Sequence, residues 1–180
     1  TLPQIKRSWD EARSGAGLGD ELGYDSLWVC DHLLGVPQPA LPILEAWTLL
    51  AAVAGLTRRA RLGTLVTPPF FRNPAVLAKQ IATLDQVAPG RVVAGLGAGW
   101  FEPEFRTTGC AFPPLGERMR ALEECALILK RLWSEDSVSF EGAHFRLDGA
   151  TCQPRPARRP EILIGGGGGG RAVGIGGRPA

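Results

Sequence analysis

The sequence predicts an α/β protein built on a parallel sheet, and two patterns carry that prediction. Short apolar runs typical of buried strands occur at residues 26–31, 61–67, 92–96 and 162–164. Helical segments separate the first three runs, which follow one another at a pitch of about 30 to 35 residues. Since parallel strands need a crossover connection, usually a helix, this alternation indicates βαβ units.

The composition is that of a globular protein and argues against several classes of partner. The 180 residues, 44% of them hydrophobic and 21% charged, suit one domain with a sizeable core. The formal net charge of +2 is too small to indicate binding to nucleic acid or to a membrane. No apolar run reaches a membrane-spanning length, and the first residues do not resemble a secretory signal. We therefore expect a cytoplasmic protein whose partner is a small molecule.

The cysteines and histidines argue against metal and hydrolase chemistry. Cys30, Cys110, Cys125 and Cys152 are far apart and form no C-x-x-C pair, so we expect reduced, mostly buried thiols. The sequence has two histidines, no H-x-x-x-H or H-E-x-x-H pattern and no nucleophile elbow.

The first predicted helix, residues 8–22, is a weak one. Ser8 is expected to be the N-cap, and Trp9, Ala12 and Leu22 are expected to face the core. Three glycines within it, Gly15, Gly17 and Gly19, each weaken a helix by up to about 1 kcal/mol.

The later elements have clearer signals. Apolar residues from Ile43 to Ala54 recur at helical spacing and predict a helix over 43–57. Asn73-Pro74 opens a helix over 74–87, and an apolar stripe predicts another over 115–133. Residues 137–147 alternate around a Glu-Gly turn and predict a small hairpin, and residues 100–114 read as a loop.

The ends of the strands carry the candidate site residues. Strand 26–31 is apolar until it stops on Asp31 and His32, and a parallel sheet binds ligands beyond the carboxyl ends of its strands. The competing interpretation of this stretch makes Asp31 a helix cap and His32 a surface histidine. Because neighbours in a strand point to opposite sides, we expect His32 rather than Asp31 to face a ligand.

Glycines and a threonine end the other strands. The segment from Gly95 to Gly99 lacks the G-x-G-x-x-G spacing of a dinucleotide site, so it either admits a flat ring close to the backbone or forms a tight turn. Thr67 offers a hydroxyl, although Thr before Pro is also ordinary turn chemistry. The glycines after Ile164 either cradle a phosphate or are low-complexity sequence.

Three further ionisable residues are considered for a catalytic role. Glu102 and Glu104 follow the third strand end and could do acid–base work, but a solvated loop is the commoner explanation. His144 lies in the hairpin, away from any strand end, and is interpreted as structural.

Taken together, these stretches resemble the bacterial luciferase-like family, in particular its branch of oxidoreductases that use coenzyme F420. The matching segments span about residues 22–168. They are LGYDSLWVCDHL, the long stretch from LEAWTLL to GLGAGWFEPEF, GERMRALEECALILKRLW, VSFEGAHFRLDGA and PEILIGGGG. The resemblance implies a (β/α)₈ TIM barrel, with the deazaflavin held at the carboxyl-terminal mouth of the strands.

The resemblance also assigns residues to the cofactor. It places Asp31 and His32 beside the ring, with His32 as the proton-transfer group. It places Leu65 and Val66 at a strand bulge that backs the ring and often contains a non-proline cis peptide. The resemblance implies further cofactor contacts for Gly97, Gly99, Gly165, Gly166 and Gly167. We add Thr67 to these candidate contacts because it lies at the end of its predicted strand. Trp100 and Pro103 stand where some relatives carry Glu and Asn.

The departures from the family pattern suggest a fragment. The chain does not begin with Met, and the family's first strand is absent before Thr1, so the sequence would hold about strands 2–5 of the barrel. We interpret residues 1–168 as the amino-terminal part of one barrel domain. Residues 169–180 read as a low-complexity tail, with a shifted reading frame as one explanation.

The expected activity is hydride transfer between F420 and a small organic substrate, in a protein that forms a homodimer when full length. One alternative is an FMN-dependent monooxygenase of the same fold that uses O₂. The other is a non-catalytic fragment, since missing strands would expose sheet edges and an apolar interior.

Overall fold

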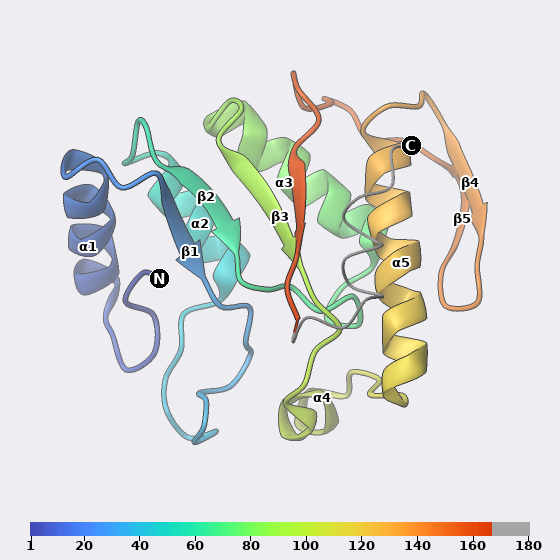
Figure 1. The fold of residues 1–180 in the computed structure, drawn as a ribbon, viewed down its shortest axis with the longest axis horizontal. Coiled ribbons are helices and arrows are strands. Elements are labelled where there is room, and N and C mark those ends of the chain that lie inside the picture. Colours follow the sequence, from blue (N-terminus) through green and yellow to red (C-terminus); the bar gives the residue numbers. More distant parts are fainter. Residues whose placement is uncertain (167–180) are drawn as a thin grey trace.

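The computed structural model describes residues 1–166, which form alternating helices and strands along most of their length (Figure 1). The tail at 169–180 and Gly167 lie outside the described residues. In chain order the elements are α1 Trp9–Glu21, β1 Ser26–Val29, α2 Ala46–Ala54, β2 Arg61–Thr64, α3 Pro74–Val87, β3 Val92–Leu96, α4 Glu102–Thr108, α5 Leu115–Leu132, β4 Val138–Glu141, β5 Arg146–Ala150 and β6 Glu161–Ile164.

The main sheet has four strands in the order β1-β2-β3-β6, and all of them run parallel. Each strand therefore pairs with the next strand of this sheet along the chain, and the predicted βαβ units are confirmed. Strands β4 and β5 form a separate antiparallel pair, which is the predicted hairpin with its second strand extended to Ala150.

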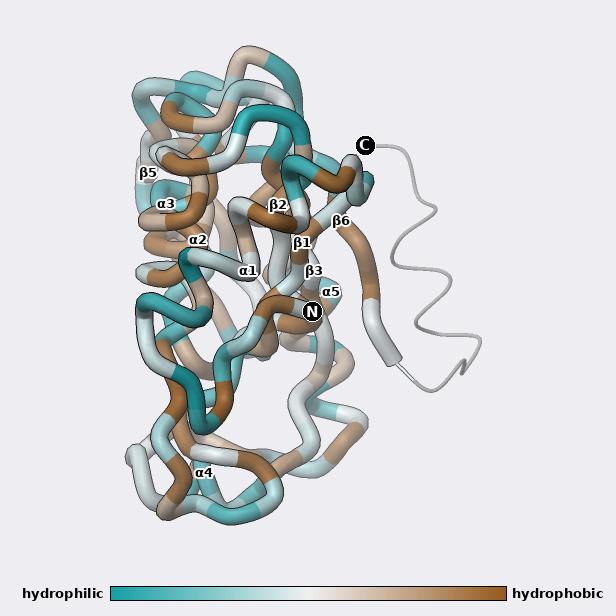
Figure 2. Tube along the Cα trace, turned by 90° about the vertical axis from the view of Figure 1, so that its left-hand side faces the viewer, coloured by the Kyte–Doolittle hydropathy of each residue, from teal (hydrophilic) through white to brown (hydrophobic). Residues whose placement is uncertain are grey.

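Helices α2 and α3 cover one face of this sheet, as Figures 1 and 2 show from two directions. Strand residues that point toward these helices, such as Leu27, Leu62 and Val92, join their apolar side chains in one core. Burial of such side chains is the main stabilising term in a domain of this kind. Its largest fully buried members include Leu50, Leu62, Leu77, Ile81, Leu96, Leu122, Ile128, Leu129 and Leu132.

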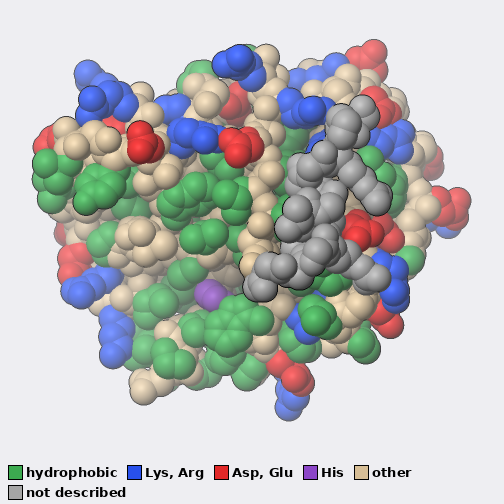
Figure 3. All heavy atoms as spheres, in the orientation of Figure 1, with side chains coloured by type: hydrophobic (Ala, Val, Ile, Leu, Met, Phe, Trp, Pro, Cys, Tyr) green, Lys and Arg blue, Asp and Glu red, His purple; other side chains and the backbone are tan. Residues whose placement is uncertain are grey.

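The opposite face of the sheet carries the alternate residues of each strand. Trp28 pairs in register with Gly63, and Gly63 with Val93. A Cβ on Gly63 would lie 2.6 Å from the Trp28 ring, so the absence of a side chain there lets the indole lie across the sheet. Figure 3 shows this face in the orientation of Figure 1, with many apolar side chains toward its centre and charged ones mostly around its rim.

Helix α1 forms despite its three glycines, and it corrects the expectation that Trp9 and Leu22 would face the core. Ser8 and Glu11 form a capping box, which supports the predicted N-cap. Ala12, as predicted, and Gly19 are buried, whereas Trp9 and Leu22 are exposed. A Cβ on Gly19 would lie 2.9 Å from Leu27, so this helix packs its small residues, not its large ones, against β1.

Several predicted boundaries also change. Helix 74–87 and strand 92–96 are confirmed, but the strands expected over 26–31 and 61–67 end at Val29 and Thr64. The helix expected over 43–57 begins only at Ala46, because the Glu45 side chain caps it, and Ile43 instead bridges to Ile5. The loop expected at 100–114 contains α4, which Gly109 ends in a left-handed conformation.

The cysteines are free thiols, as expected, and two of the four, Cys125 and Cys152, are buried. Burial raises the pKa of Cys125 to about 12. A search of the described helices finds none that combines the length and the apolar character needed to cross a membrane.

Candidate functional site

A cleft of about 740 Å³ lies at the carboxyl ends of the four parallel strands. Each strand is followed by residues that line it, with Asp31 and His32 after β1 and Leu65 and Val66 after β2. The complete lining is Asp31, His32, Leu65, Val66, Pro68, Gly97, Ala98, Gly99, Trp100, Glu104, Leu115, Met119, Leu122, Gly165 and Gly166. Eight of the predicted site residues therefore meet here, as expected for a parallel sheet.

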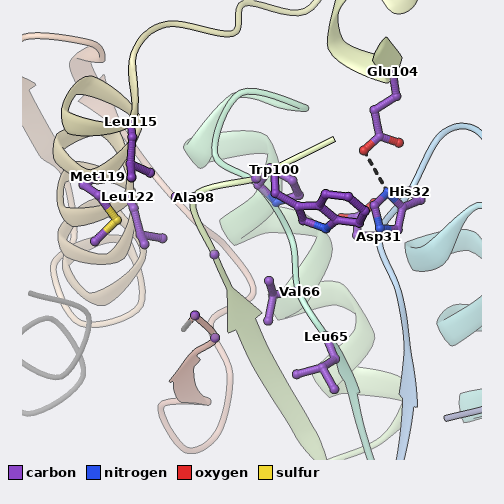
Figure 4. Close-up of a pocket in the computed structure, with 15 residues that line it drawn as sticks. Asp31, His32, Leu65, Val66, Ala98, Trp100, Glu104, Leu115, Met119 and Leu122 are labelled. Carbon is purple, nitrogen blue, oxygen red and sulfur yellow. Dashed lines mark hydrogen bonds and ion pairs between the residues drawn. The ribbon is translucent and has the colours of Figure 1, made fainter. Parts of the chain in front are cut away.

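The walls of the cleft are mainly apolar. Leu115, Met119 and Leu122 reach it from α5, and the Trp100 indole lies close to His32 (Figure 4). Trp100 is 67% exposed although it is large and apolar. Among the described lining residues, Asp31, His32 and Glu104 are the only ones with ionisable side chains. A concave apolar surface with a few convergent polar groups is typical of a small-molecule site.

His32 is held by Glu104, which corrects the expectation of a solvated loop at that position. The Nδ1 atom of His32 lies 2.8 Å from Glu104 Oε1, and the Leu33 amide donates to Oε2 at 3.1 Å. The Glu104 side chain is 1% exposed. Its neighbour Glu102 does match the solvated interpretation, because it is exposed and pairs with Arg106 on the surface.

Helix α4 places Glu104 against His32 and is itself anchored by Phe105. The Phe105 ring is fully buried between Phe71 and Phe112, at centroid distances of 4.6 and 4.9 Å. Arg118 donates to the carbonyls of Gly99 and Pro113, which lie on either side of α4 along the chain. These contacts restrict the movement of the carboxylate relative to the sheet.

Asp31 lines the cleft, but its carboxylate oxygens already accept hydrogen bonds from other side chains of the protein. Oδ2 accepts from Arg72 Nη1 at 2.5 Å, from Thr67 Oγ1 at 2.6 Å and from Trp47 Nε1 at 3.2 Å. Oδ1 accepts from Arg72 Nη2 at 3.2 Å. Both partners of this ion pair are largely buried. Asp31 therefore ties the end of β1 to α2 and to the loop before α3.

Arg72 extends this network to Glu45 at the start of α2. Its Nη2 donates to Glu45 Oε1, and the same carboxylate accepts from the Trp47 and Thr48 amides. Burial raises the pKa of Glu45, but hydrogen bonds from Thr48 and Trp47 and the charge of Arg72 together bring it below the ordinary value. An ionised carboxylate is thus favoured at this helix N-terminus.

Thr67 does not line the cleft. Its side chain is fully buried on the helix side, where its hydroxyl donates to Asp31 and accepts from Trp47. Thr67 therefore supports Asp31 from behind the cleft and does not face a ligand. The sequence offers no signal that distinguishes these two positions.

The Leu65–Val66 segment after β2 packs closely against the glycines that follow β3 and β6. The peptide bond between Leu65 and Val66 is cis, as the family resemblance implied. A Cβ on Gly97 would lie 2.3 Å from Val66 Cγ2, and one on Gly165 would lie 2.6 Å from Val66 Cγ1. Glycine is therefore needed at both positions for Val66 to occupy its place between two strand ends.

We expect Gly97→Ala to lower the free energy of unfolding by about 1–3 kcal/mol, because the added methyl must displace a stiff β-branched side chain. Urea denaturation of the intact protein measures this. The control is Gly116→Ala in α5, where nothing lies within 4 Å of the new methyl group. Equal stabilities of the two variants would contradict the close packing at Gly97.

Sequence reasoning missed several parts of this site. Arg72 and Trp47, which contact Asp31, were not candidates, and neither was Glu45, which contacts Arg72, because nothing near them in the sequence marks these contacts. A signal for α4 was present, since Pro103 follows Glu102 at a helix start and Gly109 marks a stop. That pattern predicts a short helix in which Glu104 and Phe105 could point inward together.

The whole chain matches a family model. Residues 2–180 match the family described as luciferase-like monooxygenase. The chain belongs to that family. Its parallel sheet with covering helices is therefore part of a (β/α)₈ barrel of the luciferase-like type, and the four described strands are an incomplete set.

Two relatives with different cofactors illustrate what this chain is similar to. The chain is 40% identical over 150 residues to an F420-dependent glucose-6-phosphate dehydrogenase of Kineococcus radiotolerans, covering 83% of this chain and 44% of that one. It is 36% identical over 129 residues to an FMNH₂-dependent dimethylsulfone monooxygenase of Pseudomonas putida, covering 72% of this chain and 35% of that one.

A solved structure agrees with the fold. An F420-dependent secondary alcohol dehydrogenase, in complex with an F420-acetone adduct, superposes with a TM-score of 0.82 at 30% identity. The match covers 90% of this chain and 49% of that one. The chain thus spans less than half the length of the relatives it matches.

Proposed function

We propose that the protein is an F420-dependent oxidoreductase that transfers a hydride between the deazaflavin and a small organic substrate. The observation that carries this proposal is the position of His32, held by a buried carboxylate at the edge of a glycine-lined cleft. Two of the relatives described above are named as F420-dependent dehydrogenases, which supports the same cofactor here.

The cleft suits a flat, phosphate-tailed cofactor. Gly97, Gly99, Gly165 and Gly166 line it without side chains, so a planar ring can approach the backbone closely. Leu65 and Val66 would back the ring with an apolar surface. The Gly165 amide already donates to the Leu96 carbonyl at 2.8 Å, so we propose that Gly165 lets the phosphate-bearing tail approach closely and that Gly166 offers it a backbone amide. Gly167, the third glycine of this prediction, lies outside the described residues.

The chain's own residues would bind, orient and move a proton. Leu65, Trp100 and Met119 offer apolar surface to the cofactor and the substrate and limit the access of water. His32 would accept a proton from a substrate hydroxyl, or return one to a carbonyl, because an imidazole nitrogen can act as both a proton acceptor and a proton donor. Bound F420 supplies the hydride chemistry, whereas Asp31 acts behind the site by holding the end of β1.

Titration of the intact protein with F420 and, separately, with FMN tests the proposal. We expect F420 to bind at least about tenfold more tightly, which corresponds to about 1.4 kcal/mol. Glu102→Gln is the control variant, because this exposed carboxylate lies on α4 outside the cleft and should leave binding unchanged.

The other outcomes separate the alternatives. Tighter binding of FMN would favour a monooxygenase that uses O₂, the class of the Pseudomonas relative. Failure to bind either cofactor would favour a non-catalytic chain. The homodimer that the family resemblance implies stays a prediction, which the molar mass of the intact protein in solution can check.

A further inference from the structure

We infer that Glu104 is a positioning residue that fixes His32 in the tautomer protonated at Nδ1 and leaves Nε2 as an unprotonated base at the cleft. The role of this base in catalysis depends on the proposed function. The tautomer itself does not, because it follows from contacts within the chain.

The two oxygens of Glu104 each face one nitrogen atom. Oε2 accepts the backbone amide of Leu33 at 3.1 Å, and Oε1 lies 2.8 Å from Nδ1 of His32. An ionised carboxylate can only accept hydrogen bonds, so the ring nitrogen that faces it must carry the proton. In a neutral imidazole the other nitrogen, Nε2, is then an acceptor.

The described part of the chain leaves this pairing without competition. Within residues 1–166 no arginine or lysine side chain is hydrogen-bonded to the Glu104 carboxylate, in contrast to Asp31 with its partner Arg72. The Glu104 side chain is 1% exposed, so water cannot readily replace the imidazole as its partner. A buried carboxylate without a donor would be costly, which favours the Nδ1–H form.

Aromatic contacts fix the plane of the same ring. Trp100 and Phe101 meet the imidazole edge-on, at centroid distances of 5.9 and 6.4 Å and interplanar angles of 85° and 78°. Nε2 of His32 has no hydrogen-bond partner within the described part of the chain. Figure 4 shows Glu104 on one side of the imidazole and the Trp100 indole beside it.

This arrangement assigns a direction to the proton. When a substrate hydroxyl loses its proton, the O–H bond breaks and an N–H bond forms at Nε2, so His32 becomes cationic. The Glu104 carboxylate then faces that cation across the Nδ1 hydrogen bond and stabilises it. The same division of labour between an orienting carboxylate and a histidine base operates in serine-protease triads.

The variant Glu104→Gln should invert the tautomer while nearly preserving shape. Glutamine has one acceptor oxygen and one NH₂ donor in place of two acceptors. The Leu33 amide can only donate, so it takes the oxygen, and the NH₂ group then faces Nδ1 as a donor. Nδ1 must become the acceptor, and the proton moves to Nε2, where it blocks the base.

Nitrogen-15 NMR of the imidazole rings in the intact protein reports the tautomer directly. We expect the Nδ1–H form of His32 in the native protein and the Nε2–H form in Glu104→Gln. Glu102→Gln, the matched exposed carboxylate of α4, should keep the native tautomer. The sequence has two histidines, so His144→Gln helps to assign the signals.

An Nε2–H tautomer of His32 in the native protein would overturn the inference. This test needs no variant, so the inference can be refuted even if the Glu104→Gln protein fails to fold. An unchanged tautomer in a folded Glu104→Gln protein would overturn it as well. Since these signals are read without cofactor, failed F420 binding would refute the proposed function and leave the tautomer assignment standing.

The kinetic consequence is a second test. Glu104→Gln should lower kcat by about 10²–10⁴-fold, with a smaller change in KM, because the base is blocked and not the binding surface. A folded variant with native kcat would contradict the positioning role even if the tautomer changed as expected.

Discussion

Replacing His32 with alanine should slow hydride transfer by roughly 10²–10⁴-fold, the usual contribution of a positioned general acid or base. The physical reason is its place at the cleft, with Nδ1 bound to Glu104 and the ring held by two aromatic side chains. Stopped-flow measurement of a single turnover with F420 isolates this step, and a binding titration of the variant separates lost chemistry from lost affinity.

His144→Gln is the matched control, because the other histidine of the chain lies in the hairpin segment and packs against Phe70, away from the cleft lining. Added imidazole should restore part of the rate to His32→Ala, since the deletion leaves space for it. Normal single-turnover rates in His32→Ala would show that the proposed proton-transfer role is wrong.

Asp31→Ala should lower the free energy of unfolding by about 3–5 kcal/mol, the range seen when one partner of a buried ion pair is removed. The variant leaves Arg72 largely buried with Glu45 as its remaining carboxylate, and it leaves Thr67 and Trp47 without their shared acceptor. Urea denaturation of the intact protein, compared with the native form, measures the loss.

A double variant tests whether the ion pair is the cause. Asp31→Leu with Arg72→Met removes both charges, and it should be less damaging than the sum of the single changes. The surface pair Glu141 and Arg146 is the matched control, because both side chains are exposed and Glu141→Ala should cost less than about 1 kcal/mol. Strictly additive effects at Asp31 and Arg72 would contradict the buried pair.

Local sequence patterns correctly predicted the helices and strands that have clear start and stop signals. The helix over 74–87 is bounded by Asn73-Pro74 and Pro89-Gly90, and the strand over 92–96 is uniformly apolar, so both were placed correctly. The helix predicted over 43–57 was too long. Its apolar pattern begins at Ile43, whereas the helix itself begins after the Glu45 cap and ends at Ala54. The buried face of helix α1 was predicted wrongly because the helix packs small residues such as Gly19 closely against β1, and not its large residues.

The sequence by itself determined that parallel strands would end in a common row of Asp31, His32 and glycines, because period and turn chemistry are local properties. Only the tertiary structure decided what each residue contacts. His32 meets Glu104 across 72 positions of the chain, and Asp31 meets Arg72 across 41. Such partners are chosen by how helices pack on the sheet, so no short stretch of sequence encodes them, and Asp31 and His32, adjacent in the chain, acquire different surroundings.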